Sequence, residues 1–343
     1  MVFLGHFRFF GFTYPRSLFF NNIFVSTLFS GNLAVCLFLI ISAFLICNSY
    51  KSNRIVIGGI SRILLKRYFR LAIPIGLILI IISFIHVTGI QFNSEASALN
   101  NNEMLAKMIN NVGYRELIKS IFLIPLGFSS NWLKPAWMIK YIFYGTFLAL
   151  ALFKATEKIS INKTILICVF YSFLFYLIDV YYIAIILGFA FFKINETKQE
   201  RGCKFDKFAN IIAFLSFSLF ACIRIITKMY NIFPNGFINI MNASLIICFV
   251  CNCNFCKKIL SSRPLLWLGK ISFSLYLWHV LVMCTFTSYL YIHTKWMDPS
   301  VQCMVLLISS TFVLFTVSWL SQKYIEASWA RKIQDKIMYF LES

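Results

Sequence analysis

The chain has 343 residues, of which 60% are hydrophobic and only 13% carry a charge. A soluble protein needs about a quarter of its residues charged to cover its surface, so this composition excludes a soluble globular protein. The 14 glycines and 7 prolines are too few for a collagen-like or disordered chain, and the 11 cysteines have no disulfide-framework spacing. The sequence therefore predicts an all-α fold, a polytopic bundle of transmembrane helices.

The net charge is strongly positive, because 32 Lys and Arg side chains stand against 12 Asp and Glu, a formal charge of +20. In a soluble domain this excess is typical of nucleic-acid binding. Here the cations lie between apolar stretches, which is where membrane proteins concentrate Lys and Arg in their cytoplasmic loops. We therefore expect the lipid bilayer as a partner, and no nucleic acid.

About nine apolar stretches are long enough, or nearly long enough, to cross a bilayer. The two in the middle of the chain are short and closely spaced, so this number is open by one. In chain order the stretches are 32–49, 71–90, 136–153, 164–178, 180–192, 208–227, 236–252, 271–291 and 301–320.

Every second connection between these stretches is basic, and these connections together with the C-terminal tail 321–343 hold 22 of the 32 cations. The positive-inside rule predicts that they are cytoplasmic, the C-terminus included, in a multi-pass protein of the plasma membrane. Residues 1–31 and the asparagine-rich segment 91–135 then face outward. This long extracytoplasmic loop is either a plain connector or a cover over a substrate entrance.

Two histidines stand out for opposite reasons. His279 lies inside the apolar stretch 271–291, where a polar side chain is costly enough to suggest a function such as proton transfer. The alternative for His279 is a structural hydrogen bond between helices. His6 has no helix context of its own, and by itself it is typical of an exposed tail.

A basic cluster precedes and enters the second apolar stretch, with a spacing that gathers its side chains on a helix at the cytoplasmic interface. Such a cluster suits anionic lipid headgroups or, as an alternative, the phosphates of a nucleotide-type cofactor. Its members are Arg62, Lys66, Arg67 and Arg70.

Four cysteines at the end of an apolar stretch suggest a metal or redox site at first sight. Their spacing fits no zinc motif, so we expect reduced thiols and no metal. The sequence also lacks a glycine-rich phosphate loop, a G-x-S-x-G motif and an H-E-x-x-H motif. The cysteines are Cys248, Cys251, Cys253 and Cys256.

Three parts of the chain together resemble the acyltransferase-3 family of multi-pass membrane O-acyltransferases. The first is the stretch SGNLAVCLFLIISAFLI (30–46), followed at the family's distance by a basic element that runs from Lys66 to Pro74. The second, LLWLGKISFSLYLWH (265–279), is the most specific. The third is the short element Tyr324-Ile325-Glu326 near the end of the chain.

The resemblance implies one membrane domain, 1–343, that moves an acyl group to a hydroxyl of an extracytoplasmic polysaccharide or lipid-linked glycan. Acetyl-CoA from the cytoplasm is then a donor substrate, and no bound cofactor is expected. His6 takes the position of the family's catalytic histidine, a base for the acceptor hydroxyl. The cluster Arg62, Lys66, Arg67 and Arg70 would bind the donor's phosphates, and Trp137, Lys140, Tyr276 and His279 would position the substrates.

The sequence departs from the family's pattern in several places. The arginine of the family's R-x10-H pattern would precede Met1, so we expect a truncated chain whose residues 1–31 are the outer stub of a first helix and its loop. Ile142 stands where a glutamate is expected, Ala43 replaces a glycine and Ser328 replaces a proline. A catalytically degenerate member or a non-enzymatic carrier of lipid-linked sugars is therefore the second hypothesis, and a metal-dependent redox protein is a distant third.

Overall fold

The computed structural model describes residues 1–12, 30–52, 59–109, 113–128, 133–200, 206–230, 236–333 and 335–336. Over these residues the regular secondary structure is helical, with no strand, which confirms the all-α prediction. The side chain of Arg62 lies outside the described part of the chain. The helices divide between two compact units, each described by itself below.

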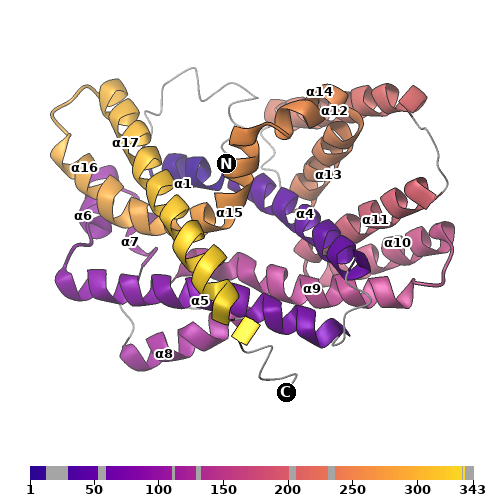
Figure 1. The fold of residues 1–343 in the computed structure, drawn as a ribbon. Helices are drawn as coiled ribbons and strands as arrows, with labels where there is room; N and C mark the ends of the chain where they lie inside the picture. The colour runs from indigo at the N-terminus through magenta and orange to yellow at the C-terminus, as the bar shows by residue number, and fades with distance from the viewer. Residues whose placement is uncertain are drawn as a thin grey trace. The chain divides into compact units, whose positions relative to one another are not determined.

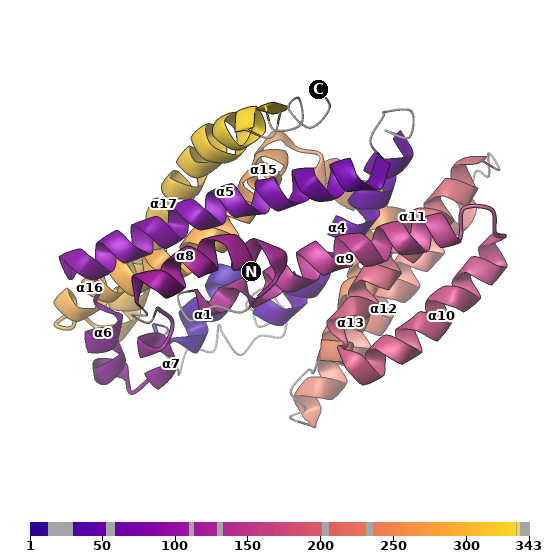
Figure 2. The ribbon, with the colours of Figure 1, turned by 90° about the horizontal axis from the view of Figure 1, so that it is seen from below.

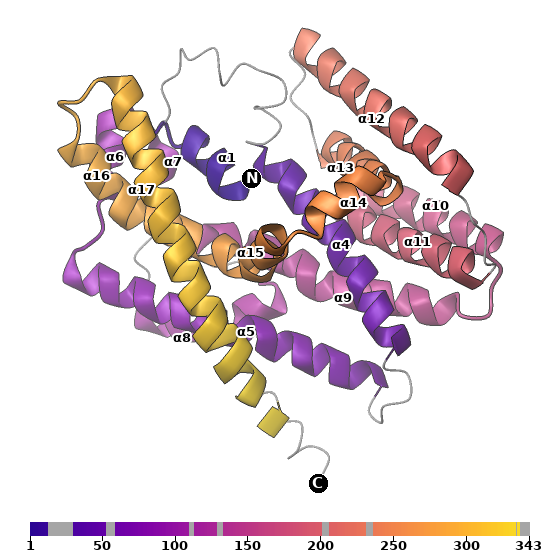
Figure 3. The ribbon, with the colours of Figure 1, turned by 45° about the horizontal axis from the view of Figure 1, so that its top comes forward.

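Unit 1 joins the segments 1–31, 65–143 and 267–343. Within it α6 packs against α16, and Figure 3 shows α7 beside them. Its elements are α1 (Val2–Phe9), most of α5 (Gly59–Thr88), α6 (Asn93–Asn100), α7 (Glu103–Ala106), α8 (Tyr114–Leu123), η1 (Ile124–Leu126), η2 (Lys134–Ala136), the start of α9 (Trp137–Ala155), most of α15 (Arg263–Val282), η3 (Met283–Thr287), α16 (Ser288–His293), α17 (Pro299–Leu320) and η4 (Ser321–Ala330).

Unit 2 joins the segments 32–64 and 144–266. Neighbours in sequence pair in space, α10 with α11 (Figure 1) and α12 with α13 (Figure 2). Its elements are α4 (Gly31–Ser52), the rest of α9, α10 (Ile161–Ile178), α11 (Tyr181–Glu200), α12 (Asp206–Met229), α13 (Gly236–Asn252) and α14 (Asn254–Leu260).

Seven of the described helices are long and apolar enough to cross a membrane, and an eighth span is present if α13 and α14, bent by 95°, count as one. The remaining predicted span corresponds to α11, whose apolar part ends at Lys193 and is therefore short. The seven are Gly31–Ser52, Ile63–Thr88, Trp137–Ala155, Ile161–Ile178, Ala209–Thr227, Arg263–His293 and Pro299–Ile333.

The segment 91–135, predicted as an outward loop, contains short helices, and two of its asparagines bind the end of α1. The side-chain amides of Asn100 and Asn102 donate hydrogen bonds to the backbone carbonyls of Phe10 and Phe9, each at 2.6 Å. The last carbonyls of a helix have no partner within the helix, so these two bonds complete the C-terminal end of α1. The asparagine-rich segment thereby positions α1 within unit 1.

In unit 2, α4 and α11 approach each other closely. A Cβ atom added at Gly188 of α11 would lie 2.2 Å from the carbonyl oxygen of Ile40 and 2.8 Å from the Cβ of Ala43 on α4. Small residues permit such close approach between membrane helices. Gly188 is therefore required where these two helices meet.

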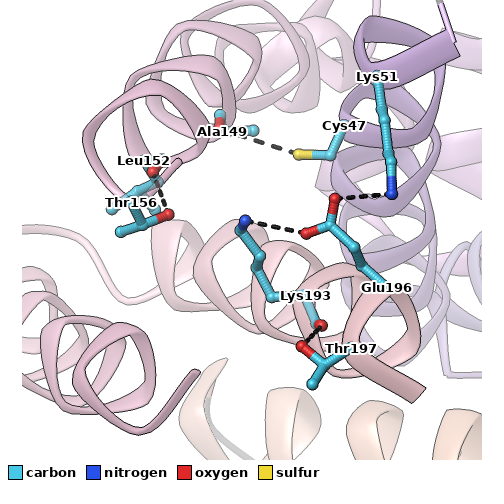
Figure 4. Close-up of polar contacts among 8 residues, drawn as sticks. All are labelled: Cys47, Lys51, Ala149, Leu152, Thr156, Lys193, Glu196 and Thr197. Carbon is cyan, nitrogen blue, oxygen red and sulfur yellow. Dashed lines mark hydrogen bonds and ion pairs between the residues drawn. The ribbon is translucent and has the colours of Figure 1, made fainter. Parts of the chain in front are cut away.

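A cluster of three charges joins the same two helices. The two carboxylate oxygens of Glu196 on α11 lie 2.9 Å from Lys51 Nζ on α4 and 2.9 Å from Lys193 Nζ (Figure 4). Lys193 is buried, and its Nζ lies 5.3 Å from the centroid of the Phe153 ring. Burial raises the pKa of Glu196, but hydrogen bonds from Lys193 and Lys51 outweigh it and hold the pKa below its ordinary value.

Candidate functional site

Two histidines far apart in sequence form one hydrogen-bonded pair in unit 1. His6 lies on α1 and His279 on α15, and Nδ1 of His6 is 2.9 Å from Nε2 of His279. The ring planes differ by only 18° and the ring centroids are 5.0 Å apart. Imidazole lone pairs and N–H bonds lie in the ring plane, so this arrangement lets a donor on one ring meet an acceptor on the other.

The two histidines differ in how many of their ring nitrogens have partners. His279 is fully buried, and its Nδ1 contacts the backbone carbonyl oxygen of Tyr276. His6 is half-buried on a helix, with its ring parallel to that of Phe10, so the expectation of an exposed tail, drawn from the residues alone, is wrong. Both nitrogens of His279 are occupied, whereas Nε2 of His6 has no protein partner among the described residues.

Three predicted substrate-binding residues lie near one another in unit 1. The Tyr276 hydroxyl forms a hydrogen bond with the backbone of Met138, which places α15 beside the start of α9. There Trp137, 40% exposed, stands edge-on to the Tyr141 ring at 5.8 Å between centroids, and Lys140 Nζ lies 4.8 Å from the centroid of that ring. The structure thus places Tyr276 beside the first turn of α9, which carries Trp137 and Lys140.

Arg70 of the basic cluster on α5 interacts with a half-buried carboxylate. Lys66 and Arg67 are half-buried, while Arg70 is exposed and interacts electrostatically with Glu326 on η4. Glu326 accepts a hydrogen bond from the Ser274 hydroxyl on α15. A buried charge is costly unless it is paired or hydrogen-bonded, so both contacts stabilise Glu326 where it lies.

Ser274 and Glu326 are absent from the residues predicted to form the site. Both lie in stretches that carry the family resemblance, and Glu326 is an acid close behind an apolar stretch, which is a signal for a specific role. Their contact joins residues 52 positions apart, and no helical or strand period connects positions that far apart. For the same reason, the sequence does not predict the contact between His6 and His279.

The structure also describes the surroundings of Ile142 and of the four clustered cysteines. Ile142, in place of the expected glutamate, is 2% exposed in the apolar core and supplies no carboxylate there. Within the described residues no group of three or more His, Cys, Asp and Glu side chains is arranged to hold a metal ion. Among the described residues, Cys248, Cys251, Cys253 and Cys256 are not joined in disulfide bonds.

Comparison with known proteins identifies the family. The family model described as an acyltransferase domain, acyltransferase-3, matches residues 1–321. None of the curated proteins and none of the solved structures compared with the chain matches it. The matched range contains the histidine pair and agrees with the membrane-spanning helices. The chain therefore belongs to the acyltransferase-3 family and is a multi-pass integral membrane acyltransferase.

Proposed function

We propose that this chain is an O-acyltransferase that moves an acetyl group from cytoplasmic acetyl-CoA to a hydroxyl of an extracytoplasmic polysaccharide or lipid-linked glycan, with His6 as the general base. The histidine pair carries the proposal, because His6 is half-buried, is held by His279 at 2.9 Å and keeps one nitrogen without a described protein partner. A sugar hydroxyl is a weak nucleophile until a base removes its proton, and imidazole does so near neutral pH.

The proposed transfer balances in atoms and charge. Nε2 of His6 accepts the proton of the acceptor hydroxyl while the hydroxyl oxygen bonds to the acetyl carbonyl carbon. The C–S bond of the thioester then breaks and its electron pair leaves with the sulfur. The proton passes from His6 to the CoA thiolate, so the products are an acetyl ester and CoA, and His6 is neutral again.

The donor's phosphates need cations at the cytoplasmic side. Lys66 and Arg67 at the start of α5 are half-buried, which favours contact with a bound anion over free solvation. Arg70 is attracted by Glu326 and completes the cluster, to which the sequence adds Arg62. Trp137, Lys140 and Tyr276 are assigned to substrate positioning because they gather beside the helix that carries His279.

Surface glycans of four strains test the proposal, with acetyl content read by mass spectrometry and proton NMR. The strains carry the intact gene, no gene, His6→Ala, or His293→Ala as a matched control, since His293 is exposed at the end of α16. We expect acetyl groups to disappear without the gene and in His6→Ala, and to persist in His293→Ala.

The other outcomes distinguish a wrong catalytic residue from a wrong reaction. Acetyl groups that persist in His6→Ala but not in the deletion would overturn His6 as the base and keep the transferase. Acetyl groups that persist in the deletion would overturn acetyl transfer to that glycan. The degenerate or carrier hypothesis, which the buried Ile142 favours, would then take its place.

A further inference from the structure

We infer that His279 is a positioning residue that holds His6 in the tautomer whose Nε2 is free to accept a proton. The catalytic meaning of this inference rests on the proposed function. The tautomer itself does not, because it follows from the hydrogen bonds of the two rings.

The positions of the protons follow from the Tyr276 carbonyl. A backbone carbonyl oxygen accepts hydrogen bonds and has no hydrogen to donate. Its partner, Nδ1 of His279, must therefore carry a hydrogen. A neutral imidazole is protonated at one nitrogen only, so Nε2 of a neutral His279 is a bare acceptor.

The surroundings of His279 favour the neutral ring. The side chain is fully buried, and burying an unpaired charge is costly. The titratable groups that act on it are His6 and the amino group of Met1, and both are positive when protonated. No carboxylate is among them, so nothing in this contact compensates a cationic His279.

These hydrogen bonds then determine the tautomer of His6. Nε2 of His279 brings no hydrogen to the 2.9 Å contact, so Nδ1 of His6 must donate it. In a neutral His6 the other nitrogen, Nε2, is therefore unprotonated. This is the nitrogen that lacks a described protein partner, and it is the atom that a general base needs.

His279 also supports the protonated state of His6. When Nε2 of His6 accepts a proton, the Nδ1–H bond to His279 becomes charge-assisted and stronger. His279 thus stabilises the imidazolium without taking its proton. Its role is that of an acceptor, distinct from a second base and from a relay.

Two substitutions separate these roles in the full-length protein in lipid bilayers. In His279→Gln the side-chain carbonyl reaches about as far as Nε2 and still accepts a hydrogen bond, but it does not titrate. In His279→Phe a ring of similar size remains, without an acceptor. We expect His279→Phe to lose kcat roughly 10- to 100-fold with KM for acetyl-CoA unchanged, and His279→Gln to recover most of that loss. Equal losses in both variants at equal membrane abundance would overturn the acceptor role.

A measurement on the rings themselves is independent of acyl transfer. Nitrogen-15 NMR of protein labelled only at histidine distinguishes protonated from bare ring nitrogens, and a His6→Gln sample assigns the His6 signals. We expect His6 to be protonated at Nδ1 and bare at Nε2 in the wild type and in His279→Gln, and to lose this preference in His279→Phe. A wild-type His6 protonated at Nε2 would overturn the inference whatever the activity. The expected tautomer together with full activity in His6→Ala would instead overturn the proposed base.

Discussion

Two partly buried polar clusters of this chain offset the cost of burial in different ways. In unit 2 the carboxylate of Glu196 is shared by Lys51 and Lys193, and each charge has an opposite charge within 2.9 Å. In unit 1 the cluster is a pair of imidazoles in which His279 uses both nitrogens and His6 uses one. In the first cluster every charge is paired, whereas in the second Nε2 of His6 has no described protein partner. The two clusters therefore differ in the unpaired Nε2 of His6, because polar side chains and partial burial are common to both.

This contrast has a measurable consequence. Substitutions in the unit 2 cluster should lower stability and leave turnover per folded molecule unchanged. Substitutions of the histidine pair should do the reverse. The following predictions concern these clusters and two contacts near them, and each is measured by thermal or denaturant unfolding in detergent, with turnover measured on the folded fraction.

The largest loss of stability is expected for Glu196→Gln. The change leaves Lys193, whose side chain is 10% exposed, without its carboxylate. Breaking a buried ion pair by removing one partner typically costs about 3–5 kcal/mol. Glu157→Gln is the matched control, because its partner Lys154 is 65% exposed and little change is expected there. Equal melting temperatures for the two variants would show that the unit 2 cluster is not structural.

Gly188→Ala is expected to have the next largest effect. The new Cβ would meet the backbone carbonyl of Ile40 at 2.2 Å, and a backbone atom yields less than a side chain. We expect a loss at the upper end of the about 1–3 kcal/mol typical of overpacking. Gly269→Ala is the control, because a Cβ there meets nothing within 4 Å. Similar stability of the two alanine variants would contradict the close approach of α4 and α11.

Ser274→Ala tests whether the second polar contact of unit 1 is structural. The change removes the hydroxyl that donates to the half-buried carboxylate of Glu326, and a hydrogen bond to a charged group contributes about 1.5 kcal/mol or somewhat more. The exposed Ser272, changed to alanine, is the control. A loss of turnover in Ser274→Ala without a loss of stability would move Ser274 into the catalytic site.

Lys51→Ala should have the smallest effect, below about 1 kcal/mol, because the Lys51 side chain is 41% exposed and solvent screens its charge. Its effect is clearest in the pH dependence. Since the folded-state pKa of Glu196 is lowered, the cluster's contribution is fully present above the ordinary glutamate pKa and is lost as pH falls through the lowered value. Lys51→Ala should shift this loss to higher pH, and an unchanged acid unfolding profile would contradict the assignment.

The fold was largely predictable because the bilayer imposes a length and an apolar composition on each helix. The ranges 71–90 and 301–320 fall inside the described helices Gly59–Thr88 and Pro299–Leu320 or within two residues of their ends. The tethers from Asn100 and Asn102 to α1 were not predictable, because an asparagine-rich segment has the composition of a plain connector. Local periodicity in a sequence does not predict which residues make contact when they lie far apart in the chain.

The candidate site was predictable only in part. The residues around His6 favour an exposed tail, and the family resemblance alone assigns it a catalytic role. His279 was recognised as a polar residue in an apolar stretch, but its partner lies 273 positions away. The pairing of the two rings, and with it the free nitrogen of His6, emerges from tertiary packing alone.

Transfer of radiolabelled acetyl groups from acetyl-CoA by the purified full-length protein in liposomes, with surface glycan as acceptor, tests the central claim most directly. The comparison is between wild type, His6→Ala and His293→Ala at matched amounts of folded protein. We predict that His6→Ala slows transfer on the order of 10²- to 10⁴-fold, the usual contribution of a general base, while His293→Ala keeps the wild-type rate. Equal rates for His6→Ala and wild type would contradict the assignment of His6 as the base.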